Sequence, residues 1–177
     1  MNPIAPHHAA SAGTTRREEI PLSASVVLVG SKLQRFALLY ARIALGATFL
    51  CVVGSRFGIW QGEPSMAHFP SFLQRTAQLN FFMPAASIPF LAWSATIFET
   101  SLGLALVLGG MIGLVAIRDH RWLRWVAMAA AILLAIFATT MTLATGIQAP
   151  LDYSVFSASA CALLLAIFPV PPTTRNL

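Results

Sequence analysis

The sequence predicts an all-α integral membrane protein: a four-helix bundle with both termini in the cytoplasm and a short interfacial helix in its first outer loop. Of the 177 residues, 57% are hydrophobic and only 10% are charged, whereas soluble domains carry about 25% charged residues. Long uncharged stretches fill the chain from Phe36 onward, and most basic residues lie at their ends. The net charge of +5 is therefore better explained by a bilayer than by nucleic acid. This composition argues against a soluble enzyme and against a disordered chain.

The chain divides into two tails and one membrane domain. Residues 1–31 are polar and rich in small side chains, so they cannot bury a core and are predicted to form a mobile tail. Residues 32–170 form the predicted four-span domain, and residues 171–177 form a short C-terminal tail. No cleavable signal peptide stands out, so the first apolar stretch is interpreted as a retained signal anchor.

Four spans are predicted from the apolar stretches. The first covers residues 36–54, and the second lies within residues 85–117, a stretch too long for a ~30 Å hydrocarbon core. We therefore expect Gly109, Gly110 and Gly113 to mark the point where this helix leaves the core. The third covers residues 125–147, and the fourth, residues 153–168, is the shortest and is bounded by prolines.

The basic residues set the predicted orientation. With the N-terminus inside, eight basic residues are cytoplasmic and two are outside, which is a clear positive-inside bias. The cytoplasmic set is Arg16, Arg17, Lys32, Arg35, Arg118, Arg121, Arg124 and Arg175, and the outer pair is Arg56 and Arg75.

The first outer loop, residues 55–84, contains many aromatic side chains. Phe69, Phe72, Leu73 and Thr76 follow one another at helical spacing, which predicts a short helix in the outer interface. Two interpretations remain open: an aromatic belt that anchors the bundle, or a lid over a site that opens outward.

Glu99 is the strongest single indication of a functional site. It lies near the middle of the second span, where a charge costs about 2.5–3.5 kcal/mol on insertion scales. Thr96 and Gly103 share its small-residue stripe, so Glu99 is predicted to face the bundle. Arg42, on a first-span stripe with Gly46, is the predicted partner, because a buried carboxyl group is either protonated or paired with a cation.

The residues leave three roles open for this polar pair. Arg42 and Glu99 could fix helix register, Arg42 could extend to the cytoplasmic interface, or the pair could bind a proton, a quinone or another ligand. On the third span, Thr142 extends a small-residue face that includes Ala131 and Ala138. The candidate ligand-binding set is Arg42, Gly46, Thr96, Glu99, Gly103 and Thr142.

A second polar pair is predicted near the outer surface. Arg56 and Asp152 could close the outer end as an ion pair, or Asp152 could cap the fourth span, which is the favoured alternative. No metal site is predicted, because the histidines fall outside the spans and no cysteine cluster is present. The sequence contains no visible nucleophile–base pair, so no catalytic residue is assigned.

Three segments resemble the DoxX family of membrane proteins. The first is ARIALG at residues 41–46 with Phe49 and GSRFG at residues 54–58. The second combines LNFFMP at 79–84, TIFETSLG at 96–103 and LGG at 108–110, and the third is APLDYSVFS at 149–157. Together they cover residues 32–168 in the order in which the family has them.

The resemblance implies a four-helix protein of the inner membrane, in a family that includes a subunit of thiosulfate:quinone oxidoreductase. It singles out Arg42, Gly46, Arg56, Glu99 and Asp152 for testing. The expected function is a redox-associated subunit without its own redox centre and without a covalently bound cofactor. It would bind a quinone or similar lipid-soluble molecule near Arg42 and Glu99, beside a soluble or membrane oxidoreductase partner. The alternative is a non-catalytic scaffold; nucleic acid is not an expected partner, and homo-oligomerisation stays open.

Overall fold

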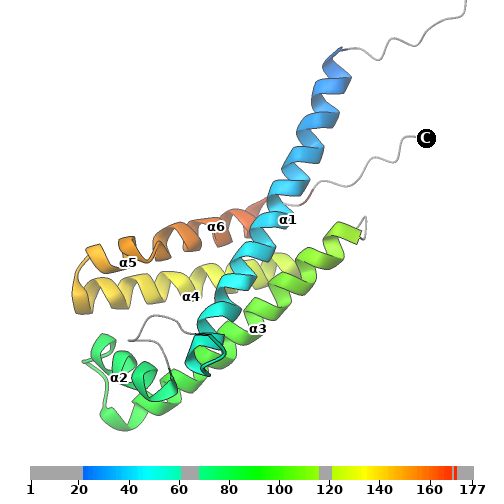
Figure 1. Ribbon diagram of the computed structural model, residues 1–177. Coiled ribbons are helices and arrows are strands. Elements are labelled where there is room, and N and C mark those ends of the chain that lie inside the picture. The colour runs from blue at the N-terminus through cyan, green and yellow to red at the C-terminus, as the bar shows by residue number, and fades with distance from the viewer. Residues whose placement is uncertain (1–21, 61–67, 116–120, 169, 171–177) are drawn as a thin grey trace, which may run out of the picture.

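The computed structural model describes residues 22–60, 68–115, 121–168 and 170, and only the backbone of residues 22–29 and 115. Within these ranges all secondary structure is helical (Figure 1). The elements are α1 (Leu22–Arg56), α2 (Phe69–Leu79), η1 (Ala85–Ser87), α3 (Ile88–Val115), α4 (Trp122–Thr145), α5 (Gln148–Asp152) and α6 (Val155–Ile167). The all-α prediction is confirmed for this part of the chain.

Three of the described helices are long and apolar enough to cross a membrane: Gly30–Arg56, Ala85–Leu114 and Trp122–Thr145. Their exposed surfaces carry many large hydrophobic side chains, as expected where a surface meets lipid. The fourth apolar helix, α6, has only 13 residues, or about 20 Å, and is shorter than a ~30 Å hydrocarbon core. The structure therefore supports a multi-pass membrane protein.

The first helix begins earlier than the sequence predicts. It starts at Leu22 instead of near Phe36, so residues 22–31 are helical although they were assigned to the mobile tail. After Pro21 the sequence has no proline until Pro64, and nothing therefore interrupts the helix in this stretch. Residues 1–21 and 171–177, the remainder of the predicted tails, lie outside the described residues, as do Arg16, Arg17, Arg118 and Arg175.

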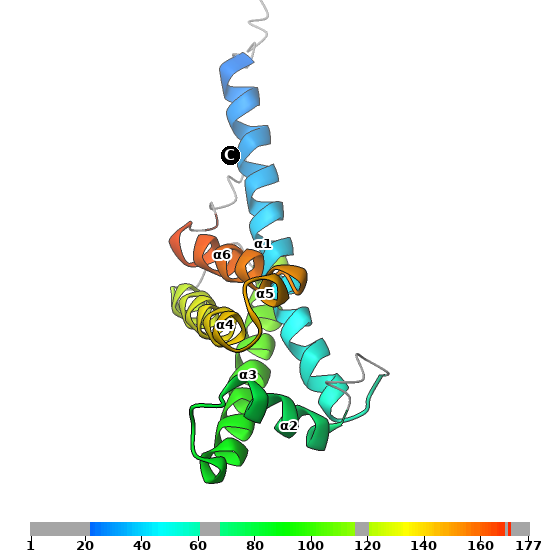
Figure 2. The same ribbon diagram turned by 90° about the vertical axis from the view of Figure 1, so that its left-hand side faces the viewer.

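The long helices form two antiparallel pairs. The most extensive contacts are those of α1 with α3 and of α4 with α6. Figures 1 and 2 show that the α4–α6 pair crosses the α1–α3 pair obliquely. The two pairs thus meet over part of their lengths and diverge towards the end where α2 lies.

Glycines allow α1 and α3 to approach closely. A Cβ atom on Gly46 would lie 2.7 Å from the carbonyl oxygen of Gly103, and one on Gly110 would lie 2.6 Å from Cγ1 of Ile43. These contacts show that the α3 stripe containing Gly103 and Gly110 packs against α1, in an antiparallel register that places the start of one helix beside the end of the other. Close approach of this kind is typical of small residues in membrane helices.

Gly109, Gly110 and Gly113 do not mark the end of the second span. All three lie inside α3, which continues to Val115, and each is packed against a neighbouring helix. A Cβ atom on Gly113 would lie 2.6 Å from Leu39 of α1, and one on Gly109 would collide with Leu123 of α4. These glycines are packing positions.

Small side chains also hold α4 against α6. Ala127, Ala130 and Ala162 are fully buried between these helices. Two polar side chains bridge them: Ser159 Oγ donates to the carbonyl oxygen of Ala131 at 3.0 Å, and Arg124 Nε donates to that of Ala166 at 2.9 Å.

The predicted fourth span is two helices in the structure. The short α5 ends at Asp152, and α6 begins at Val155 after Ser154, whose φ of 55° is left-handed. Ser154 is the N-cap residue of α6 and makes no side-chain cap hydrogen bond. The preferred role of Asp152 as the cap of this span is therefore wrong, because the chain turns between Asp152 and the helix.

Candidate functional site

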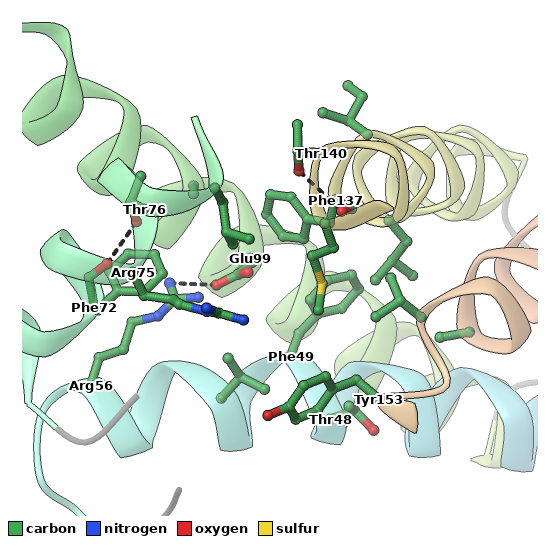
Figure 3. A pocket seen from close by; sticks show the side chains of 18 of the residues that line it. Thr48, Phe49, Arg56, Phe72, Arg75, Thr76, Glu99, Phe137, Thr140 and Tyr153 are labelled. Carbon is green, nitrogen blue, oxygen red and sulfur yellow. Dashed lines mark hydrogen bonds and ion pairs between the residues drawn. The ribbon is translucent and has the colours of Figure 1, made fainter. Parts of the chain in front are cut away.

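Glu99 is buried in the interior, and its partner is Arg56. Glu99 is 3% exposed and Arg56 is 2% exposed, and Nη1 of Arg56 lies 2.5 Å from Oε2 of Glu99 (Figure 3). The predicted pairing of Glu99 with Arg42 is wrong. The antiparallel register places the C-terminal end of α1 opposite Thr96 and Glu99 of α3, whereas Arg42 lies almost four turns earlier on α1.

Arg56 joins three helices. Its Nη1 also donates a hydrogen bond to Thr96 Oγ1 at 2.9 Å, and Thr96 Oγ1 in turn donates to the carbonyl oxygen of Ala92 at 2.9 Å. On α2, the ring of Phe72 lies 3.6 Å from the Arg56 guanidinium carbon, a cation–π contact that is stronger in a desolvated site. The guanidinium is thus enclosed by α1, α2 and α3.

The short helix predicted in the first outer loop is present as α2. Its Phe72 and Thr76 are buried, and Thr76 Oγ1 donates to the carbonyl oxygen of Phe72 at 2.8 Å. Its first residue, Phe69, packs on Trp93 of α3 with ring centroids 4.6 Å apart. Of the two interpretations of this loop, the packing favours the lid, because α2 folds inward over Arg56 and forms one wall of a cavity.

The cavity has a volume of about 320 Å³ and is lined by residues of α1, α2, α3, α4 and α6. This is within the usual size range of ligand pockets. Its wall is mostly apolar and comes from every long helix; the apolar lining is Leu45, Phe49, Val52, Phe72, Leu79, Leu91, Ala95, Leu134, Ile136, Phe137, Met141, Val155 and Ala158. The polar lining is Thr48, Arg56, Arg75, Thr76, Asn80, Glu99, Thr140 and Tyr153. Such a wall suits an apolar molecule with a polar head.

The structure brings together only part of the predicted site. Thr96 and Glu99 meet at Arg56, whereas Gly46 and Gly103 serve helix packing. Arg42 is 1% exposed on α1 and is not among the residues that line the cavity.

Two further predicted residues lie away from this cluster. Thr142 is absent from the cavity lining, and its hydroxyl donates to the carbonyl oxygen of Ala138 at 2.7 Å. Asp152 is exposed at the end of α5, and the predicted Arg56–Asp152 pair is not formed, because Arg56 is buried against Glu99.

Arg75 and Phe72 were missed as candidate site residues. Figure 3 shows the Arg75 side chain extending into the cavity beside the Arg56–Glu99 pair. The two residues lie three positions apart on α2, so they share a face of this helix. The sequence contained one indication of the role of Arg75. It is an arginine on the inward face of an amphipathic helix, next to an intramembrane carboxylate.

Within the described residues, no three His, Cys, Asp or Glu side chains are placed to hold a metal ion. The comparisons with known proteins found no matching family model, no similar curated protein and no similar solved structure.

Proposed function

We propose that this chain is a DoxX-like, multi-pass protein of the inner membrane that binds a quinone or similar lipid-soluble molecule. In this proposal it is a redox-associated subunit, and a separate oxidoreductase protein supplies the electrons. The observation that carries the proposal is the buried Arg56–Glu99 pair in the wall of a mostly apolar cavity of about 320 Å³. Charged groups inside a membrane domain are costly and usually serve a function.

The lining suggests which residues would bind each part of the ligand and which would handle the proton. The aromatic and aliphatic walls take the apolar part of the molecule, and the guanidinium groups of Arg56 and Arg75 donate hydrogen bonds to its oxygen atoms. Glu99 holds or passes the proton that reduction of a quinone oxygen requires. The site proposed from the sequence near Arg42 therefore moves to Arg56, and Glu99 keeps its role.

The proposed topology has four spans and both termini in the cytoplasm. One contact supports the proposal that the basic residues of α1 and those before α4 lie on the same side of the membrane. Arg35 Nη2 donates a hydrogen bond to the carbonyl oxygen of Gly113 at 2.6 Å. This contact places the basic stretch of α1 beside the end of α3, and Gly109 near that end packs on Leu123, which lies between Arg121 and Arg124 at the start of α4. The fourth span would combine α5 and α6, and the two crossing pairs would tilt differently in the bilayer.

A second candidate is a non-catalytic scaffold that recruits a partner protein. It is favoured by the contacts of Arg56, since the ion pair, the Thr96 hydrogen bond and the Phe72 ring tie α1, α2 and α3 together. In a scaffold this cluster would only fix the helix arrangement.

The quinone content of the purified protein separates the two candidates. The wild type, Glu99→Gln and a control, Thr142→Val, are purified in a mild detergent, and extracted quinone is quantified per chain. Stoichiometric quinone in the wild type and the control, with loss in Glu99→Gln, is the expected result. Absence of quinone from all three samples, also after incubation with decylubiquinone, contradicts the quinone proposal and leaves the scaffold.

A further inference from the structure

The charges that line the cavity do not cancel. Among the described residues, the charged side chains in its wall are Arg56, Arg75 and Glu99. Arg56 and Glu99 neutralise each other as a buried ion pair. The hydrogen bond of Arg75 is to the neutral side chain of Gln78, at 3.4 Å on the exposed side of α2. The cavity therefore carries one positive charge that no described carboxylate balances.

The hydrogen-bond donors of the cavity are also mainly cationic. The hydroxyl groups of Thr48, Thr76 and Thr140 donate to carbonyl oxygens of their own helices, at 2.9, 2.8 and 3.0 Å. A hydroxyl has a single proton to donate, so these groups can only accept from a ligand. Asn80 Nδ2 donates one of its two hydrogens to the carbonyl oxygen of Thr76, so its second hydrogen and the Tyr153 hydroxyl are the neutral donors of the lining.

The guanidinium groups are the charged donors of the cavity, and hydrogen bonds from charged donors are the stronger ones. Arg56 Nε is buried and makes no hydrogen bond within the described part of the chain. Arg75 extends into the cavity beside it (Figure 3). Two guanidinium groups next to an apolar wall are complementary to a ligand with several acceptor oxygens.

We propose that the ligand is an amphiphile with an anionic carboxylate or phosphate head that binds to Arg75, and with an apolar chain that lies along Phe49, Leu134 and Phe137. Arg75 is then the residue that selects the head group, because a guanidinium can donate two parallel hydrogen bonds to either kind of oxyanion. This inference rests on the proposed function in its wider form, a lipid-soluble ligand in this cavity, and it favours an anionic amphiphile over a neutral quinone.

Binding to matched charged and neutral amphiphiles tests the inference. The protein in a non-ionic maltoside detergent is titrated with oleate, with its neutral methyl ester, with dioleoyl phosphatidate, with dioleoyl phosphatidylcholine and with decylubiquinone. The variants are Arg75→Gln, Arg75→Lys and the control Arg121→Gln, which removes an exposed arginine outside the cavity. Native mass spectrometry at increasing probe concentrations gives the dissociation constants and the stoichiometry.

The expected result is that at least one anion binds about tenfold or more tightly than its neutral counterpart, as for a hydrogen bond to a charged group. Arg75→Gln abolishes this preference, whereas Arg75→Lys and Arg121→Gln retain it. Tighter binding of oleate identifies a fatty acid as the source, and tighter binding of phosphatidate identifies a phospholipid.

Three results overturn the inference in distinguishable ways. If decylubiquinone binds and no anion is preferred, the anionic ligand is wrong while the proposed function stands. If Arg75→Gln leaves the preference for the anion intact, the assignment of the head group to Arg75 is wrong. If none of the five probes binds, both the inference and the proposed function fail.

Discussion

Replacing Glu99 with glutamine would leave the guanidinium of Arg56 buried without its counter-charge. The two side chains are 2–4% exposed and lie 2.5 Å apart, so water cannot take the place of the carboxylate. A guanidinium stays charged, whereas a carboxyl group can become neutral by binding a proton. The two single substitutions are therefore expected to have unequal effects.

The expected loss in the free energy of unfolding depends on which charged group each substitution leaves buried without a partner. Glu99→Gln leaves an unpaired buried charge and is expected to lower the free energy of unfolding by about 3–5 kcal/mol. Arg56→Met removes the charge and its hydrogen bond to Thr96, and is expected to cost about 1–3 kcal/mol. In the double variant no charge remains, so its stability should approach that of Arg56→Met. Adding the second substitution to Glu99→Gln should thus restore about 2 kcal/mol.

Reversible unfolding in mixed micelles of dodecyl sulfate and dodecyl maltoside, followed by circular dichroism, measures these free energies. Arg121→Met, which removes an exposed arginine, serves as the control and should stay within about 0.5 kcal/mol of wild type. Additive losses in the double variant, or a loss below about 1 kcal/mol for Glu99→Gln, would refute the reasoning that the pair is buried and mutually dependent.

Three further predictions follow from the packing, the cavity and the topology. Gly46→Ala should be less stable than Gly30→Ala by about 1–3 kcal/mol in the same assay. A Cβ atom on Gly46 meets backbone atoms at 2.7 and 2.9 Å, whereas one on Gly30 meets nothing within 4 Å, and the gain in helix propensity is common to both. Equal stabilities would show that α1 and α3 do not pack through this glycine. Ala95→Phe places a ring in the cavity wall and should weaken ligand binding about tenfold or more while the helical circular dichroism stays unchanged; unaltered affinity would mean that the ligand lies elsewhere. In a background without the native cysteines, a cysteine at position 121 should react with an impermeant maleimide only from the cytoplasmic side, and one at position 152 only from the outside. Labelling of Arg121→Cys and Asp152→Cys from the same side would contradict the four-span topology.

Hydropathy was sufficient to predict the long helices, and the small-residue stripe around Glu99 predicted that its side chain faces the bundle. Each apolar stretch has to satisfy its backbone hydrogen bonds within itself, so helices follow directly from composition. The glycines predicted close helix packing for a different reason. Gly46 and Gly103 leave a surface that only another helix can fill closely.

The partner of Glu99 was predicted incorrectly because depth was counted along each helix from a shared membrane surface. In the structure α1 begins at Leu22 and continues through Arg56, so Arg56 is part of the helix and not of the outer loop. The register of α1 and α3 is fixed by packing, with Gly46 against Gly103. Counting outward from that contact places Arg56 and Glu99 towards the same end of the helix pair and Arg42 towards the opposite end.

The cavity could not be predicted from single-helix patterns. It depends on the oblique crossing of the two helix pairs (Figures 1 and 2) and on the inward fold of α2. Thr142 illustrates the point: it shares a helical face with Ala138, but only Ala138 is fully buried. Crossing angles arise from how side chains of two surfaces interlock, and the sequence of one helix does not contain that information.

The shortness of α6 has a consequence for the surrounding lipid. Its 13 residues extend about 20 Å, roughly 10 Å less than the average hydrocarbon thickness. In the proposed four-span topology α6 supplies most of the fourth span, and a span shorter than the core is accommodated by local thinning of the bilayer at a cost of a fraction of a kcal/mol per ångström. Lipids with shorter acyl chains remove that cost, so the protein should partition preferentially into the thinnest regions of its membrane.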